Sequence, residues 1–166
     1  MSEKKVTAIT DSLLDELLAK AASSPRLRAI HCFHSGDWEH SHRMLNALKV
    51  GTYVRPHLHA SEYQSEGFIL LRGKLALLLF DYEGNIIREQ SRILSAKDGC
   101  FGMDLPPAVW HSLVALEDTV IYEVKGHPAG GYIQERDKNF ASWSPEEGSP
   151  ESEKYLAKLE SEARLL

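Results

Sequence analysis

The apolar pattern changes from helical spacing near both ends of the chain to strand-like runs through its middle. From residue 11 to residue 22, apolar side chains recur at helical intervals, at Leu13, Leu14, Leu17, Leu18 and Ala21. Ser149, Pro150 and Glu151 open a second helix with a capping serine, a proline at the first helical position and an acid in the first turn. Helices this short are unstable alone in water, so we expect both to pack on the periphery of the fold.

Strand-like runs separated by turn residues fill the region between these helices. They cover residues 44–54, 66–71, 74–80, 86–94, 100–105, 110–117 and 119–125. The breaks at 72–73, 81–85, 97–99 and 106–107 hold Gly, Pro, Asn and Asp, the residues of turns. Short strands without long helices between them predict an all-β fold, an antiparallel sandwich or barrel. The run LALLLF at 75–80 is apolar on both faces, and we expect both faces to be covered.

Charge and composition narrow the list of partners. The formal net charge is −5 at pH 7 with the histidines neutral, so we expect no binding to nucleic acid or to an anionic membrane surface. No apolar run approaches the roughly 18 residues that a membrane span needs. The first residues lack the pattern of a signal peptide. We therefore expect a cytoplasmic protein whose ligand is a small molecule.

Four side chains form a candidate metal site. His57 and His59 are two positions apart, so on an extended chain their imidazoles leave the same face. Glu66 stands at the start of the next apolar run, and His111 stands at the start of a later one. Side chains at the ends of neighbouring strands converge inside a barrel, and three imidazoles with one carboxylate suit a borderline divalent metal. The set does not distinguish Fe, Mn, Co, Ni, Cu and Zn.

The other histidines of the N-terminal half have a simpler interpretation. His40 and His42 form a second His-x-His pair, but the segment from 26 to 42 is polar and irregular, which favours solvated loop histidines. His31 and His34 either line the pocket or hydrogen-bond the N-terminal segment to the barrel, and we favour the second role.

Three further residues are weak candidates for catalysis. Tyr53 and Arg55 share the two-residue phase of the histidine pair, so both are expected to point into the barrel near the metal. There Arg55 holds an anionic substrate group, or instead forms a salt bridge at the rim. Glu123 lies between apolar neighbours in a strand-like run. It is either a buried acid that carries a proton or, the commoner case, a surface acid on an edge strand.

These motifs resemble those of the cupin superfamily. Its first motif is a glycine, five residues, His-x-His, a short spacer, a glutamate, six residues and a glycine. Here it is formed by Gly51, His57, His59, Glu66 and Gly73, with a spacer of six residues where three or four are usual. The second motif, Pro-x-Gly-x-x-His, spans residues 106–111 with Ala108 in place of the glycine. Alanine tolerates positive φ poorly, so the substitution leaves the conformation of this turn open.

A closer resemblance joins the chain to the cupin-fold metalloproteins of the WbuC type. It is carried, between about residues 18 and 148, by the segments SPRLRAIHCFH, ALKVGTYVRPHLH, ILLRGKLALLLFD, LPPAVWHSLVALE and FASWSP. The resemblance implies a cupin, a double-stranded β-helix or jelly-roll barrel, with short peripheral N- and C-terminal helices. One domain would span 1–166, with a helix and arm at 10–42, the barrel core at 43–126 and a C-terminal extension at 127–166. One divalent metal ion at the four ligands and a link to bacterial polysaccharide gene clusters are also implied.

Two classes of function remain open. In an octahedral shell, the ligand set leaves about two positions free. The first class is therefore a metal-dependent enzyme, an oxygenase or an isomerase, acting on a small polar and saccharide-related substrate. The second is a non-catalytic small-molecule-binding or regulatory cupin with a bound metal; a purely structural metal is the third alternative. We also expect a homodimer, because a lone barrel would leave the two-faced run and the terminal helices under-covered.

Overall fold

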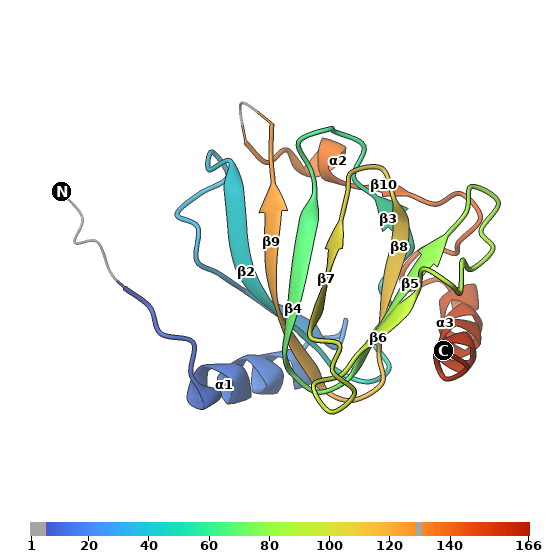
Figure 1. Cartoon of the computed structure of the whole chain (residues 1–166), viewed down its shortest axis with the longest axis horizontal. Helices are drawn as coiled ribbons and strands as arrows, with labels where there is room; N and C mark the ends of the chain where they lie inside the picture. The colour runs from blue at the N-terminus through green and yellow to red at the C-terminus, as the bar shows by residue number, and fades with distance from the viewer. Residues whose placement is uncertain (1–5, 129–130) are drawn as a thin grey trace.

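Two antiparallel sheets, packed face to face, make up the body of the protein (Figure 1). The computed structural model describes residues 6–128 and 131–166. One sheet has the strand order β1-β2-β9-β4-β7, and the other has the order β10-β3-β8-β5-β6. Neighbours in each sheet come from distant parts of the chain, so the chain crosses repeatedly between the sheets. The predicted all-β fold with short terminal helices is confirmed.

The described elements are three helices and ten strands. Their bounds are α1 (Asp11–Ala22), β1 (Arg28–Cys32), β2 (Ser41–Leu48), β3 (His57–Leu58), β4 (Glu66–Arg72), β5 (Leu75–Phe80), β6 (Arg92–Leu94), β7 (Gly102–Leu105), β8 (Trp110–Ala115), β9 (Thr119–Gly126), α2 (Gln134–Asp137), β10 (Asn139–Phe140) and α3 (Pro150–Ala163). The predicted first helix coincides with α1. The predicted runs at β4, β5, β7, β8 and β9 agree with the structure to within one or two residues.

Three expectations about the strands are wrong. The segment from 26 to 42 is not irregular, because β1 pairs along its whole length with β2. The run at 44–54 ends at Leu48, and a turn follows in which Gly51 has a φ of 90°, a conformation that suits glycine. The run at 86–94 keeps only the short β6. Its first half turns instead, with the backbone N–H of Ser91 donating to the carbonyl of Ile87 (2.9 Å).

The main apolar core fills one half of the space between the sheets. Its buried members are Leu48, Phe68, Leu70, Leu75, Leu77, Leu79, Leu94, Leu105, Leu113, Ala115 and Ile121. Burying one large apolar side chain stabilises a fold by about 1.5–3 kcal/mol, so this cluster holds the two sheets together. The other half of the space is polar and contains the candidate site.

The terminal helices cover the outer faces of the two sheets. Helix α1, capped by the Thr10 hydroxyl, places Leu14, Leu17 and Ala21 on the outer face of the β1-β2-β9 side. Helix α3 places Leu159 and Ala163 against β5 and β8. Ser149 is the N-cap residue of α3 as predicted, but its hydroxyl makes no capping hydrogen bond.

Every residue of β5 is buried, which confirms that the LALLLF run is covered on both faces. The cover on its outer face comes from α3 and from Trp143, both of which belong to the C-terminal extension. The premise that this strand needs a second subunit to cover it is therefore wrong. None of the helices described here is both long and apolar enough to cross a lipid bilayer.

Candidate metal centre

Strands from both sheets bring the four predicted ligands to the polar half of the interior. His57 in β3 pairs directly with His111 in β8. Glu66 is the first residue of β4, in the facing sheet, and His59 follows β3. All four side chains are buried, with exposed fractions between 2% and 4%. The barrel therefore holds three imidazoles and one carboxylate away from bulk water.

The ligand atoms of these side chains converge on one point. Atoms of the three imidazoles lie within 4.8 Å of one another, the single such group of three found among the residues that the structure describes. His59 Nε2 lies 3.0 Å from Glu66 Oε1, and His111 Nε2 lies 3.2 Å from Glu66 Oε2. These contacts do not have hydrogen-bond geometry: within the described part of the chain, His59 Nε2 and Glu66 Oε2 have no hydrogen-bond partner. An unsatisfied buried polar atom costs about 1–3 kcal/mol, and a cation at the common point would satisfy both atoms. The donor set fits a divalent metal.

The other ring nitrogen of each histidine faces a backbone carbonyl. His57 Nδ1 lies 2.8 Å from the Arg55 oxygen and His111 Nδ1 lies 3.0 Å from the Val109 oxygen. His59 Nδ1 contacts the carbonyl of Asp137. Donation from Nδ1–H fixes the tautomer in which Nε2 carries a free lone pair, the arrangement typical of metal-ligating histidines.

A strained turn positions His111 against His59. Ala108 has a φ of 63°, the left-handed conformation that the motif position predicts for glycine. Its N–H donates to the carbonyl of His59 (2.8 Å), which ties the two halves of the site together. The alanine at this position keeps the turn at a cost in backbone strain.

Burial and charge set the protonation of the ligands. Burial lowers the pKa of His57 well below its ordinary value, and the nearby Lys138 adds to this effect. Burial alone would raise the pKa of Glu66, but the imidazoles of His111 and His59 outweigh it and hold that pKa well below the ordinary value. Glu66 is thus a carboxylate and His57 a neutral imidazole, the forms that bind a metal.

The site lies on the wall of a cavity of about 570 Å³ between the sheets. Val54, Phe68 and Leu113 give the cavity an apolar side. Its polar side chains besides the ligands include Asn46, Glu123, Lys125 and Lys138. Cavities of 300–1,000 Å³ with a few placed polar groups are typical of small-molecule sites.

Glu123 projects into this cavity from the middle of a sheet. It is 9% exposed and accepts a hydrogen bond from the Asn46 amide at 2.6 Å. Burial raises the pKa of Glu123 to about 7, and the charge of Glu66 adds to the shift. The alternative of a surface acid on an edge strand is wrong, because β9 lies between β2 and β4.

Tyr53 does not point toward the metal ligands, contrary to the expectation from its phase. Its hydroxyl donates to the carbonyl of Pro145 (2.9 Å), and its ring packs with the α3 side of the second sheet. Val54 lines the cavity instead. Residues 52–56 belong to no strand, so their side chains do not alternate between two faces. The side of the barrel that Tyr53 faces therefore cannot be inferred from that of His57.

Arg55 also turns away from the cavity, and the same expectation is wrong for it. Its guanidinium donates to the carbonyls of Ala141 (3.2 Å) and Ser144 (3.3 Å) and lies over the ring of Phe140. A longer ionic contact of 3.9 Å joins it to Glu146. Arg55 therefore fastens the C-terminal extension to the barrel, which is close to the alternative role of a rim contact.

Sequence reasoning missed two buried charges beside the site. Lys125 Nζ lies 2.8 and 2.9 Å from the two carboxylate oxygens of Asp137, and both residues are at most 6% exposed. The Asp137 carbonyl contacts His59, so the C-terminal extension helps to orient a candidate ligand. Lys125 shares the inward phase of Glu123 in β9, and this alternation could have identified it. Nothing in the sequence marks Asp137.

The remaining histidines of the N-terminal half range from exposed to buried. His40 is exposed as expected, but His42 lies in β2 and is only 4% exposed, so its prediction as a solvated loop residue is wrong. His34 contacts the backbone of Arg43 in β2, as favoured, and also lines the cavity. His31 packs its ring edge-on against Phe33.

Comparison with known proteins supplies a family and a fold. The family model of a domain of unknown function (DUF6016) matches residues 9–92. No curated protein sequence matches the chain. A Klebsiella pneumoniae protein with a double-stranded β-helix domain superposes with a TM-score of 0.55 at 13% identity, covering 84% of this chain and 99% of that one. An oxalate oxidase in complex with the substrate analogue glycolate gives 0.51 at 14% identity, with 84% and 74% covered.

The capsular polysaccharide assembling protein CapF from Staphylococcus aureus gives a TM-score of 0.53 at 19% identity. It matches 70% of this chain, which spans only 32% of the length of CapF. Identities this low establish a shared fold and nothing further. The predicted fold is confirmed: the barrel is a double-stranded β-helix of the cupin type.

Proposed function

The chain belongs to the DUF6016 family, and from this premise and its cupin fold we propose that it is a metal-dependent enzyme acting on a small polar, saccharide-related molecule. One observation carries the proposal. Buried and unpartnered ligand atoms of His59 and Glu66 meet the imidazoles of His57 and His111 on the wall of a substrate-sized cavity.

The four side chains would hold one divalent metal ion of the Fe, Mn, Co, Ni, Cu or Zn group. An ion with three nitrogen ligands and one oxygen ligand keeps about two positions open in an octahedral shell. When bound, such an ion supplies Lewis acidity to a substrate oxygen and lowers the pKa of a bound water.

The chain's own residues would bind the substrate and manage its protons. The apolar wall of Val54, Phe68 and Leu113 limits the water in the cavity. Glu123, held by Asn46, has a pKa near 7 and can therefore both hold and release a proton at physiological pH. A buried group of this kind on the cavity wall suits a reaction with a proton transfer, such as an isomerisation or an oxygenation.

The saccharide class rests on resemblance and guides the first compounds to be assayed. The WbuC-type segments imply a polysaccharide context, and CapF, by its name, assembles capsular polysaccharide. The oxalate oxidase was seen with glycolate, so small hydroxy acids and oxalate form a second group of compounds. Sugars, sugar acids and hydroxy acids share the hydroxyl and carboxylate oxygens that would bind such a metal.

Metal analysis followed by activity assays tests the proposal. The purified protein should contain one equivalent of a divalent metal and turn over a sugar, sugar acid or hydroxy acid, with or without oxygen consumption. His111→Gln should lose both the metal and the turnover. His40→Gln, a change at an exposed histidine, is the matched control and should retain both. Equal turnover in wild type and His111→Gln would refute metal-dependent catalysis. Metal binding and ligand-dependent stabilisation without turnover would instead support the non-catalytic binding cupin.

A further inference from the structure

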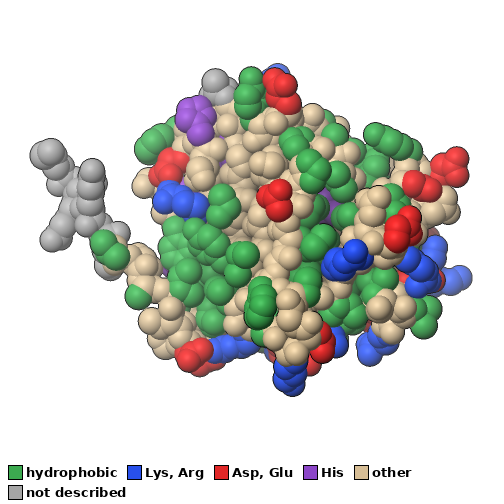
Figure 2. All heavy atoms as spheres, viewed as in Figure 1, with side chains coloured by type: hydrophobic (Ala, Val, Ile, Leu, Met, Phe, Trp, Pro, Cys, Tyr) green, Lys and Arg blue, Asp and Glu red, His purple; other side chains and the backbone are tan. Residues whose placement is uncertain are grey.

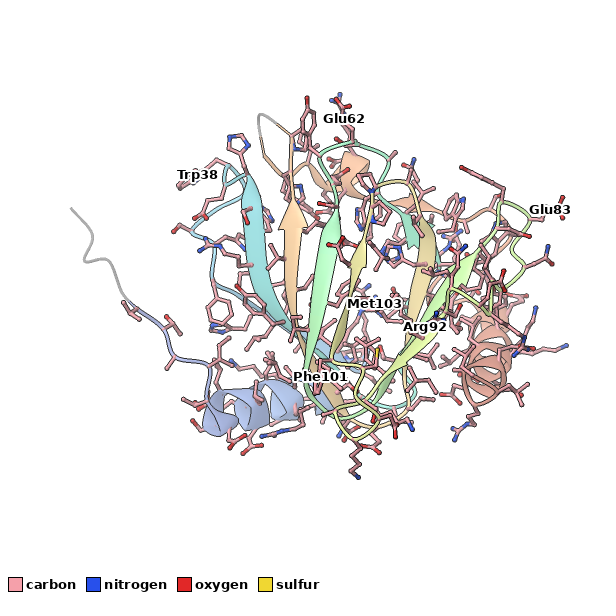
Figure 3. All side chains as sticks on the ribbon, viewed as in Figure 1. Trp38, Glu62, Glu83, Arg92, Phe101 and Met103 are labelled. Atoms are coloured by element: carbon pink, nitrogen blue, oxygen red, sulfur yellow. The ribbon has the colours of Figure 1, made fainter. Side chains whose placement is uncertain are left out.

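We propose that His42 and His127 form a second metal-binding site, for an ion such as Zn²⁺, separate from the site of His57, His59, Glu66 and His111. His42 lies on the inner side of β2, and His127 directly follows β9. Both contact the loop between β1 and β2, in which Trp38 is labelled in Figure 3: His34 stacks on His42, and the His127 N–H donates to the His40 carbonyl. His42 lines the same cavity as the first site.

The two imidazoles lie side by side. Their ring centroids are 4.1 Å apart and their planes are inclined by 52°. The corresponding values for His57 and His111 in the candidate metal centre are 4.4 Å and 56°. The rings of His42 and His127 are therefore as close together as those of the candidate ligand pair, and inclined by a similar angle.

Both imidazoles are buried with an unused nitrogen. His42 and His127 are each 4% exposed, and within the described residues the Nε2 atom of each has no hydrogen-bond partner. Leaving a buried polar atom unsatisfied costs about 1–3 kcal/mol, and here two such atoms lie on adjacent rings. An ion that accepts both lone pairs removes both costs.

Neither imidazole needs to lose a proton to bind a cation near neutral pH. Burial lowers the pKa of His127 to about 4, with smaller contributions from Lys125 and His42. Burial likewise lowers the pKa of His42, and His34 adds to the effect. Neutral imidazoles are good ligands for Zn²⁺, Cu²⁺ and Ni²⁺ and poor ligands for Mg²⁺ and Ca²⁺, which sets the class of ion.

Neighbouring residues hold His42 and His127 in place, but His34 does not supply a third ligand. His34 stacks on His42, with ring centroids 3.9 Å apart and ring planes inclined by only 14°. Because the two rings are nearly parallel, their ring nitrogens do not point toward a common ion. The backbone N–H of Tyr132 donates to the Asp37 carbonyl (2.7 Å), and that of His127 to the His40 carbonyl (2.8 Å). These bonds hold the segment carrying His127 against the loop that precedes His42.

Three charged side chains lie around the pair. Lys125 lies opposite His42 in the β2–β9 register and would repel a cation, but its ammonium is paired with both oxygens of Asp137. The carboxylate of Asp37 lines the same cavity. With only two protein ligands, the second site should bind more weakly than the first and release its ion first to a chelator.

Zn²⁺ titration of the metal-free, full-length protein by equilibrium dialysis and calorimetry tests the inference. Wild type should bind two equivalents, one tight and one weaker. His127→Gln and His42→Gln should each bind only the tight equivalent, and His111→Gln should keep only the weaker one. His40→Gln, at an exposed position two residues before His42, should bind two. Circular dichroism verifies that each variant is folded.

An NMR measurement on wild type makes the test independent of any variant's folding. Zn²⁺ beyond the first equivalent should shift the side-chain ¹⁵N resonances of His42 and His127 and leave His40 unchanged. A single equivalent that disappears in His111→Gln, with no shift at His42 or His127, overturns this inference and leaves the proposed function standing. A second equivalent that survives in both His42→Gln and His127→Gln also overturns it. A weaker equivalent lost in His127→Gln, with no binding that depends on His111, supports the inference and refutes the first site.

Discussion

His57 and His111 lie directly opposite each other in the β3–β8 ladder, with ring centroids 4.4 Å apart. Strand β3 is only two residues long, so this pairing depends on supports outside the ladder. One is the hydrogen bond from the Ala141 N–H to the Pro56 carbonyl (3.0 Å), and another is that from Ala108 to His59. The metal centre is thus assembled by a short strand, a strained turn and the C-terminal extension together.

Metal binding should stabilise the fold. An ion that binds only the native state raises the free energy of unfolding by RT ln(1 + [L]/Kd), about 2.7 kcal/mol at 100 times Kd. We expect Zn²⁺ to raise the Tm of the chelator-treated wild type by several degrees. His59→Gln should abolish most of this increase, and the exposed control His40→Gln should retain it. Differential scanning calorimetry with and without metal measures the effect; an unchanged Tm in wild type would contradict it.

Ala108→Gly should stabilise the protein. The left-handed conformation costs a non-glycine residue about 1–2 kcal/mol, and glycine avoids this cost. Glycine also makes the unfolded chain more flexible, which offsets about 0.4–1 kcal/mol. We therefore expect a net gain of about 0.5–1 kcal/mol in urea unfolding with an unchanged m-value.

Gly73→Ala tests the opposite change, an alanine introduced where a glycine holds a positive φ. Gly73 has a φ of 84°, and an added Cβ would lie 2.3 Å from the carbonyl oxygen of Asp118. This substitution should destabilise the fold clearly in the same assay. Destabilisation by Ala108→Gly would show that Ala108 is not strained.

Removing one partner of the buried ion pair should destabilise the fold much more than replacing both partners with apolar residues. Asp137→Ala leaves Lys125 buried without a partner, which costs about 3–5 kcal/mol. The double variant Lys125→Met with Asp137→Leu replaces both charges with apolar groups and should recover most of that loss. Chemical denaturation of the single and double variants forms the cycle. Equal losses in both would mean that the pair contributes through its packing and not through its charges.

Glu123 should make stability depend on pH in a defined window. Its pKa in the folded protein is about 7, above the ordinary 4.5, so the native state holds a proton that the unfolded state has lost. The free energy of unfolding therefore falls as pH rises from about 4.5 to about 7, by about 3 kcal/mol in total from this group. Below the lower value both states are protonated and the effect is absent.

The difference between wild type and Glu123→Gln isolates this contribution from the histidines that titrate in the same range. In chelator-treated protein, Glu123→Gln should gain stability relative to wild type as pH rises through the window. Glu89→Gln, at an exposed acid, is the control and should track wild type. A constant difference between Glu123→Gln and wild type from pH 4.5 to pH 7 would contradict the shifted pKa.

The homodimer stays a prediction, but its support now comes from another surface. Figure 2 shows hydrophobic side chains gathered over the β2-β9-β4 sheet just above α1. Exposed apolar side chains of this sheet and the adjoining loop include Ile69 (51%), Leu71 (38%), Phe101 (59%) and Val124 (36%), and Phe101 is labelled in Figure 3. Contiguous exposed apolar side chains are typical of protein interfaces.

Sedimentation at micromolar concentration should show a dimer for wild type. Phe101→Glu should shift it toward monomer, because a charge would be buried in the interface. Tyr82→Glu alters another exposed aromatic residue (82%), on the loop that follows β5, and is the matched control. A monomeric wild type would overturn the prediction.

The sequence by itself determined the elements whose signals are local. The leucines of α1 repeat at helical spacing, and the LALLLF run has the uniform apolar character of a strand covered on both sides. The spacing of His57, His59, Glu66 and His111, together with the resemblance to the cupin motifs, predicted that the four side chains meet, because alternation within a strand and strand ends within a barrel follow general rules. The alanine at the glycine position of the cupin motif left the conformation of its turn open, and the structure gives Ala108 the positive φ.

Only the tertiary structure decided which faces and edges those elements present. Tyr53 and Arg55 turned outward because residues 52–56 leave the ladder. His42 became buried because its segment pairs with β9, where Lys125 lies opposite it. The ion pair of Lys125 with Asp137 joins β9 to the C-terminal extension, a long-range contact that no local pattern records. Local pattern fixes what a segment can form. Pairing between distant segments fixes which side of it is buried, and in this barrel it decides which polar groups line the cavity.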